Sequence, residues 1–126
     1  MNATYDFGMV GLGVMGQNLL LNIADNGFAA IGFDLNSEKT TALEAAATPG
    51  TMVKGVNSLA EMVQVLKVPR TVRLLVPAGK PVDDVINSLL PLLQPGDIII
   101  DGGNSFYTDT IRRVTQIAPT GIHFMG

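Results

Sequence analysis

The sequence predicts one α/β domain with a mainly parallel sheet and helices on both faces, on the strength of two observations. Short apolar runs of β-like composition alternate along the 126 residues with longer runs whose apolar residues recur at helical spacing. The β-like runs are almost continuously apolar, as strands are when helices cover both faces of their sheet. Alternation of strand and helix implies parallel pairing through right-handed crossovers, which gives a doubly wound architecture.

The expected elements divide the chain regularly. Strands are predicted over residues 7–10, 28–33, 51–54, 71–76, 97–101 and 122–125, and helices over residues 14–26, 37–47, 58–66, 82–93 and 105–118. In the first helix the apolar residues Met15, Leu19 and Ile23 share one face, and Gly27 is placed to close the helix.

Boundary signals mark the later helices. Ser37 is a candidate N-cap for the second helix, and Ser58 with Glu61 has the spacing of a capping box for the third. Pro81 suits the first turn of the fourth helix, because its missing N–H would have no helical partner there. Pro95–Gly96 is typical of a turn before the fifth strand.

Composition is that of one folded domain over residues 1–126. Hydrophobic residues make up 47% and charged residues 15%, which disfavours disorder. No apolar run approaches the roughly 20 residues of a membrane span, no secretory signal is visible, and there are no cysteines, so a cytoplasmic protein is expected. A net charge of −3 without a basic patch favours neither nucleic acid nor membrane as a partner, and no residues are assigned to a metal.

A glycine motif occupies the first strand–helix junction. Gly11-Leu12-Gly13-Val14-Met15-Gly16 fits G-x-G-x-x-G between a predicted strand and a predicted helix, which is the context that the motif requires. Gly11 permits the tight turn, Gly13 lets a pyrophosphate approach the backbone, and Gly16 lets the helix pack close to the strand. The alternative is a glycine-rich turn without a ligand. We favour a Rossmann-type dinucleotide-binding domain, because three glycines at this spacing cost stability unless a ligand needs them.

Asp34 ends the second strand, close to the ~20-residue spacing at which such domains place an acidic acceptor for the adenosine ribose hydroxyls. A carboxylate about 5 Å from a 2′-phosphate, at an effective dielectric near 20, repels each phosphate charge by roughly 3 kcal/mol before screening. The sequence therefore predicts NAD as the preferred cofactor over NADP. The alternative role for Asp34, capping the next helix, fits Ser37 better.

A second segment narrows the family. The stretch from Pro95 to Ser105, which includes Asp101-Gly102-Gly103-Asn104, resembles the decarboxylating 6-phosphogluconate dehydrogenases of the β-hydroxyacid dehydrogenase superfamily. Tyr107, Asp109-Thr110, Arg112-Arg113, Pro69-Arg70 and Val82-Asp83-Asp84 continue the likeness over essentially the whole chain.

The resemblance implies a set of cofactor contacts. All of them follow the carboxyl ends of predicted parallel strands, where open α/β sheets build their ligand crevice. These positions are Gly11, Leu12, Gly13, Val14, Met15 and Gly16 at the pyrophosphate, Asp34, Leu35 and Asn36 at the adenosine ribose, Val76, Pro77 and Ala78 beside the cofactor, and Asn104 between cofactor and substrate.

Two departures from the family pattern bear on the cofactor. Where the family usually has Asn-Arg-Thr in contact with the NADP phosphate, this chain has Asp34-Leu35-Asn36, so a cation is lost and a carboxylate gained. Where the family often has a lysine after the fourth strand, this chain has Pro77.

Five polar positions have structural interpretations. Asn104 has a second reading as a turn residue after Gly102-Gly103, and Asp101 is expected to organise that turn rather than to transfer protons. His123 is expected to be a satisfied structural residue, and Arg112-Arg113 a solvated helix face.

The resemblance also implies a parent enzyme. It would oxidatively decarboxylate 6-phospho-D-gluconate to ribulose 5-phosphate, with reduction of NAD(P), in the pentose phosphate pathway. Its lysine base and glutamate acid would lie beyond Gly126, in a C-terminal helical domain that binds substrate and forms a homodimer. No catalytic residue is expected within residues 1–126, so this chain would bind cofactor with negligible turnover.

Two other functions stay open at this point. One is the cofactor domain of a different β-hydroxyacid dehydrogenase, and the other is a non-enzymatic NAD-sensing module. Fold alone does not separate them.

Overall fold

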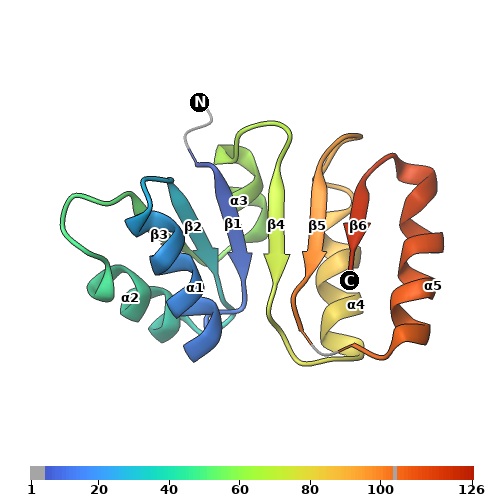
Figure 1. Cartoon of the computed structure of the whole chain (residues 1–126), viewed down its shortest axis with the longest axis horizontal. Coiled ribbons are helices and arrows are strands. Elements are labelled where there is room, and N and C mark those ends of the chain that lie inside the picture. Colours follow the sequence, from blue (N-terminus) through green and yellow to red (C-terminus); the bar gives the residue numbers. More distant parts are fainter. Residues whose placement is uncertain (1–4, 104) are drawn as a thin grey trace.

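A computed structural model describes residues 5–103 and 105–126. Its six strands form one sheet in the order β3-β2-β1-β4-β5-β6, and every neighbouring pair is parallel (Figure 1). The strands are β1 (Phe7–Val10), β2 (Ala30–Phe33), β3 (Val53–Val56), β4 (Thr71–Leu74), β5 (Ile98–Asp101) and β6 (His123–Met125). This order is that of the doubly wound nucleotide-binding fold, as the sequence predicts.

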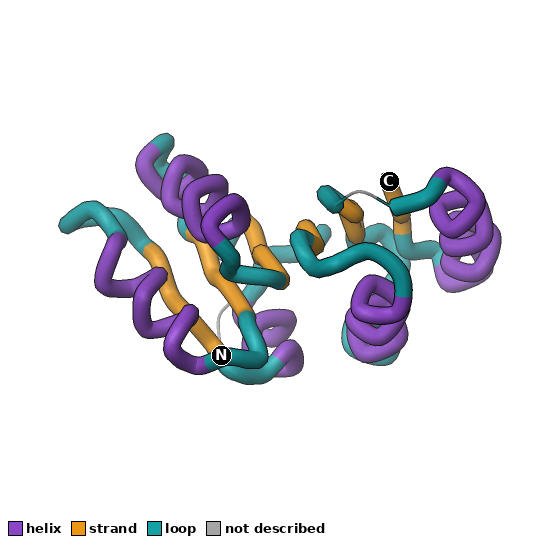
Figure 2. The backbone as a smooth tube through the Cα atoms, turned by 90° about the horizontal axis from the view of Figure 1, so that it is seen from below, coloured by secondary structure: helices purple, strands orange, loops and turns teal. Residues whose placement is uncertain are grey.

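Helices lie on both sides of the strands (Figure 2). They are α1 (Val14–Asp25), α2 (Ser37–Ala46), α3 (Leu59–Val65), α4 (Lys80–Leu89) and α5 (Tyr107–Ile117), followed by the short 3₁₀ helix η1 (Ala118–Thr120). Within the part of the chain that the structure describes, no helix is long and apolar enough to cross a membrane.

Two separate cores result from the alternation of side chains along the strands. Met9 of β1 packs with α1 and α2 in a cluster that includes Leu20 and Leu43. Its neighbour Val10 belongs to a larger cluster on the other face, built with α3, α4 and α5. Successive strand residues point to opposite faces, so β1, β2 and β3 each contribute to both cores, whereas the core residues of β4 and β5 belong to the larger cluster.

The ends of several elements differ from the sequence prediction for local reasons. β2 begins at Ala30 rather than at Phe28, because the preceding Ala29 donates its N–H to the Asp6 carboxylate at 2.8 Å. α4 ends at Leu89, just before Pro91, which lacks the N–H needed to continue the helix.

Helix capping is partly as predicted. Gly27 follows α1 with φ +94, and Ser58 accepts a hydrogen bond from the Glu61 N–H at 3.4 Å. The prediction that Ser37 caps α2 is wrong: Asn36 is the N-cap, and its side chain accepts from the Glu38 N–H at 3.0 Å. Ser37 already lies inside the first turn, where its carbonyl accepts from a threonine hydroxyl.

A buried ion pair joins the amino ends of β4 and β5. The Asp97 side chain is fully buried and accepts from the Arg70 N–H at 2.8 Å, the Arg70 guanidinium at 3.1 Å and the Gln94 N–H at 2.9 Å. Because these groups lie at the edge of the sheet opposite to the glycine motif, this carboxylate serves the fold rather than the candidate site.

Candidate functional site

The glycine motif forms a tight turn between β1 and α1. Gly11 has φ +101, and a Cβ there would collide with the Leu75 carbonyl oxygen. A Cβ on Gly16 would collide with the carbonyl oxygen of Gly11. These two glycines are therefore required by the chain's own packing, whatever the turn binds.

Gly13 differs from its two neighbours in the motif. It is exposed, its φ of −64 is open to any residue, and a Cβ there would meet nothing within 4 Å. It is also the N-cap of α1, where no side chain caps the helix and no acidic residue lies in the first turn. The positive end of the helix dipole is thus uncompensated beside open space, which suits an anionic group approaching the backbone.

Asp34 faces this turn from the end of β2. Its carboxylate accepts from the Leu12 N–H at 2.9 Å and from the Asn36 N–H at 2.8 Å, one bond to each oxygen. The hypothesis that Asp34 caps α2 is wrong, since Asn36 takes that role. A carboxylate has about four acceptor positions, so Asp34 retains capacity for further donors.

Two cavities follow the carboxyl ends of the strands. One has a volume of about 550 Å³ and lies between the end of β2 and α4, with Asp34, Leu35 and Pro77 in its wall. The other, of about 310 Å³, lies between the start of α1 and the loop after β5. Both are lined by Gly13, Leu75 and Val76, so they adjoin each other along one edge of the sheet.

Asp101 shapes the loop on the far side of the smaller cavity. It is buried and accepts from the Gly103 N–H at 3.1 Å and from the Ser105 hydroxyl at 2.5 Å. The expectation that Asp101 organises the Gly102-Gly103 turn is confirmed, and both glycines line the cavity.

The prediction of a solvated Arg112–Arg113 face is wrong for one of the two residues. Arg112 is half-exposed, whereas Arg113 is fully buried and bonded to Asp83. Adjacent helical residues point about 100° apart, so one can face solvent while the next faces the core.

His123 is exposed at the amino end of β6, paired in register with Ile98. The sequence predicts a satisfied structural residue at this position, and the structure places it in a strand with its side chain open to solvent. It also lies at the opposite edge of the sheet from the two cavities.

The structure brings most of the predicted contact positions together, with some exceptions. Leu12 turns its side chain into the core, and Asn36 and Ala78 line neither cavity. Asn104 lies outside the described residues. The positions in the cavity walls are Gly11, Gly13, Val14, Met15, Gly16, Asp34, Leu35, Val76 and Pro77.

Sequence reasoning missed the contribution of α2 and α4 to the larger cavity. Lys39 of α2 and Pro81, Asp84 and Val85 of α4 line it. The spacing of the α4 residues over one helical turn, directly after a predicted strand end, is the signal that could have indicated them.

No metal centre is evident within the described residues: no three His, Asp or Glu side chains there gather in a way that could hold an ion.

Comparison with known proteins agrees with this geometry. A family model of the NAD-binding domain of 6-phosphogluconate dehydrogenase matches residues 6–126. The decarboxylating 6-phosphogluconate dehydrogenase of Homo sapiens is 51% identical over 124 residues, covering 98% of this chain and 26% of the human protein. That of Schizosaccharomyces pombe is 50% identical over 121 residues, covering 96% of this chain and 25% of the relative.

Solved structures extend the comparison. Plasmodium falciparum 6-phosphogluconate dehydrogenase, described with NADP+ and with its substrate 6-phosphogluconate, has a TM-score of 0.89 at 38% identity, covering 94% of this chain and 26% of that one. Mycobacterium tuberculosis 3-hydroxyisobutyrate dehydrogenase has a TM-score of 0.81 at 21% identity, covering 96% and 39%, which shows a shared fold. This chain spans about a quarter of the length of the curated relatives. Because the family model covers nearly all of it, the chain belongs to the NAD-binding domains of the 6-phosphogluconate dehydrogenases.

Proposed function

We propose that the chain binds NAD along the carboxyl edge of its sheet, as the cofactor domain of a decarboxylating 6-phosphogluconate dehydrogenase. The observation that carries the proposal is the open space at Gly13, beside an uncapped helix N-terminus and between two adjoining cavities. The residues present fit a dinucleotide: one cavity for each end of the molecule and a backbone turn for the diphosphate between them.

The proposed orientation follows from the position of Asp34. Its remaining acceptor positions would bind the adenosine ribose hydroxyls, which places adenosine in the larger cavity against Leu35, Pro81 and Val85. The nicotinamide end would then lie in the smaller cavity near Gly102-Gly103. The cofactor would supply hydride acceptance, while these residues bind and orient it.

NAD is the proposed cofactor rather than NADP. Two backbone N–H groups hold the Asp34 carboxylate in place, so it cannot easily turn away from a 2′-phosphate. Asp84 also lines this cavity, but its carboxylate is paired with Lys80 at 2.9 Å, so the preference rests on Asp34. Lys39 also lines it, but this residue is exposed and carries its charge on a flexible stem. The fixed carboxylate therefore outweighs the solvent-exposed ammonium in the proposed preference.

The proposed parent enzyme acts on 6-phosphogluconate as a homodimer, with a C-terminal helical domain that supplies the general base, the general acid and most substrate contacts. The proposal rests on relatives about half identical to this chain, whose names state the decarboxylating activity. Residues 1–126 alone would bind cofactor without turning over substrate.

Isothermal titration calorimetry of the purified chain with NAD+ and NADP+ tests the proposal. We expect saturable 1:1 binding of NAD+ and affinity for NADP+ at least tenfold weaker, a difference of about 1.4 kcal/mol. Equal or inverted affinities would contradict the preference, and no binding of either would contradict the function. Rapid NAD+ reduction by the isolated chain with 6-phosphogluconate would contradict the claim that the catalytic groups lie elsewhere.

A further inference from the structure

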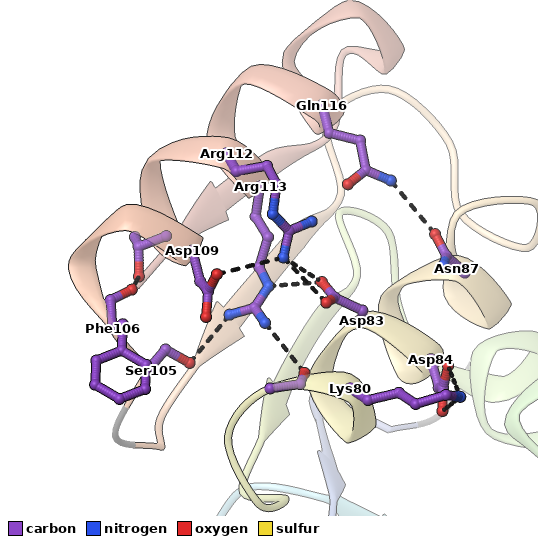
Figure 3. A network of polar contacts seen from close by, with 12 residues as sticks. Lys80, Asp83, Asp84, Asn87, Ser105, Phe106, Asp109, Arg112, Arg113 and Gln116 are labelled. Atoms are coloured by element: carbon purple, nitrogen blue, oxygen red, sulfur yellow. Dashed lines mark hydrogen bonds and ion pairs between the residues drawn. The ribbon is translucent and has the colours of Figure 1, made fainter.

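Arg113 is a fully buried cation that the function proposed above does not use. Its guanidinium donates to the Asp83 carboxylate at 2.8 Å, the Ser105 hydroxyl at 3.1 Å and the Gly79 carbonyl at 3.2 Å (Figure 3). The carboxylate of Asp101 lies 3.6 Å from it. One side chain of α5 therefore contacts α4, the end of β5 and two loops.

Those two loops border the candidate cofactor site. The first, which we term the β4–α4 loop, spans residues 75–79 and places Leu75 and Val76 in the walls of both cavities. The second, the β5–α5 loop, has residues 102–103 and 105–106 in the described part of the chain, and it places Gly102 and Gly103 in the smaller cavity. Arg113 bonds to Gly79 in the first loop and to Ser105 in the second.

The chemistry of the contact depends on the shape of a guanidinium. A buried charge is costly unless it is paired and its donors are satisfied, and here a planar fork reaches acceptors from three segments at once. A lysine ammonium in the same place is a point charge and cannot span the same acceptors. An apolar side chain would suffice if this position only filled the core, as Ile117 does one helical turn later.

The exposed contacts between α4 and α5 do not extend to the two loops. Gln116 donates to Asn87 at 3.3 Å, and both residues are exposed. Arg112 donates to Asp83 and lies near Asp109, so its partners are on helices only. Figure 3 shows these contacts between α4 and α5, and among them Arg113 is the side chain that contacts the two loops.

We propose that Arg113 is a positioning residue for the cofactor site, which fixes the spacing between the β4–α4 and β5–α5 loops through Gly79 and Ser105. The inference rests on the proposed NAD-binding function. Arg113 lines neither cavity, yet in this proposal it sets the width of the smaller cavity, which would receive the nicotinamide end.

Four variants and a double variant of the chain test this. Arg113→Lys keeps the charge but loses the planar guanidinium. Ser105→Ala removes the hydroxyl that accepts from Arg113 and also donates to Asp101, and the double variant, Arg113→Lys with Ser105→Ala, separates these two contacts. Gln116→Ala breaks the comparable exposed bridge, and Ile117→Val lowers stability at a neighbouring core position without touching the loops. Calorimetry with NAD+ well below each unfolding midpoint gives the affinity, and amide hydrogen exchange at Gly103 reports the β5–α5 loop without any ligand.

We expect Arg113→Lys to raise the Kd for NAD+ roughly tenfold and Ser105→Ala to raise it roughly threefold. The double variant should have a Kd close to that of Arg113→Lys, because the Arg113–Ser105 contact is already lost in the single variant. Exchange at Gly103 should accelerate in both. Gln116→Ala and Ile117→Val should stay within about twofold of the parent Kd.

Unchanged Gly103 exchange and an unchanged Kd in Ser105→Ala would overturn the inference, even if Arg113→Lys failed to fold. An equal loss of affinity in Ile117→Val would overturn it too, because that result follows from lost stability alone. If the parent chain did not bind NAD+, the proposed function would fail, while Gly103 exchange would still report whether Arg113 holds the loop.

Discussion

The carboxylate of Asp34 accepts a hydrogen bond from the backbone N–H of Leu12 at 2.9 Å, which joins the end of β2 to the middle of the glycine turn. A second bond, from the Asn36 N–H, holds the other oxygen. One side chain thus holds the turn to the end of β2 and places a carboxylate in the wall of the larger cavity.

Replacing Asp34 by asparagine should reverse part of the cofactor preference. The variant removes the charge that would repel a 2′-phosphate, so we expect the ratio of NADP+ to NAD+ affinity to rise about tenfold or more, measured by calorimetry. Glu38→Gln is the matched control, since Glu38 is an exposed acidic residue nearby on α2 that lines neither cavity. A ratio that moves equally in both variants would show that net charge alone is responsible.

Substitutions at Gly13 and Gly16 should distinguish a loss of cofactor affinity from a loss of stability. At Gly13 an added methyl meets open space, so Gly13→Ala should change the free energy of unfolding by less than about 1 kcal/mol, because a modest N-cap loss offsets the gain in chain stiffness. The same methyl would occupy the space proposed for the diphosphate, so the Kd for NAD+ should rise at least tenfold.

Gly16→Ala is the contrasting variant, because its Cβ would collide with the Gly11 carbonyl. Urea unfolding should show a loss of several kcal/mol, as expected for overpacking against rigid backbone. If Gly13→Ala bound NAD+ as tightly as the parent chain, the proposed position of the diphosphate would be wrong.

Asp83 should contribute an acid-sensitive part of the stability. Its hydrogen bond from the Arg113 guanidinium, supported by Arg112, holds the pKa of the Asp83 carboxyl below its ordinary value, although burial opposes the shift. A lowered folded-state pKa means that the stabilisation is present above the unfolded pKa of about 4 and is lost as pH falls through the folded value.

Urea titrations of the parent chain and of Asp83→Asn should therefore differ by roughly 2–4 kcal/mol at pH 7, since the buried Arg113 guanidinium loses its hydrogen-bonded anion and keeps only the Asp101 carboxylate, 3.6 Å away. The difference should shrink as the pH falls below about 4. Asp84→Asn removes the exposed pair with Lys80 and should cost less than about 1 kcal/mol. A gap between parent and Asp83→Asn that is constant down to pH 2 would refute the linkage.

The Asp97–Arg70 pair should affect folding without affecting binding. Asp97→Ala leaves the largely buried Arg70 guanidinium and the backbone N–H groups of Arg70 and Gln94 without their acceptor. We therefore expect a loss of roughly 3–5 kcal/mol in the free energy of unfolding. At a temperature where the variant is folded, its Kd for NAD+ should match that of the parent chain. Lys54→Ala, which breaks an exposed pair with Glu61, should cost less than about 1 kcal/mol. A higher Kd in Asp97→Ala would mean that the amino and carboxyl edges of the sheet are coupled.

The sequence alone determined the order and type of the main elements, the parallel sheet and the place of the glycine turn between β1 and α1. These features depend on local signals: the period of apolar residues, the capping residues, and glycines at fixed spacing between a strand and a helix. Asp34 was also identifiable, because its place after the second strand is set by chain connectivity.

Tertiary structure decided the features that depend on which face of an element meets which neighbour. Arg112 and Arg113 are chemically alike and adjacent, yet only Arg113 is enclosed, because the rotation of α5 against α4 directs it to Asp83 and the two loops. The contribution of Asp84 and Pro81 to the larger cavity has the same origin. A linear pattern specifies where a helix begins, but the contacts that bury a charge or line a cleft come from residues far apart in the chain.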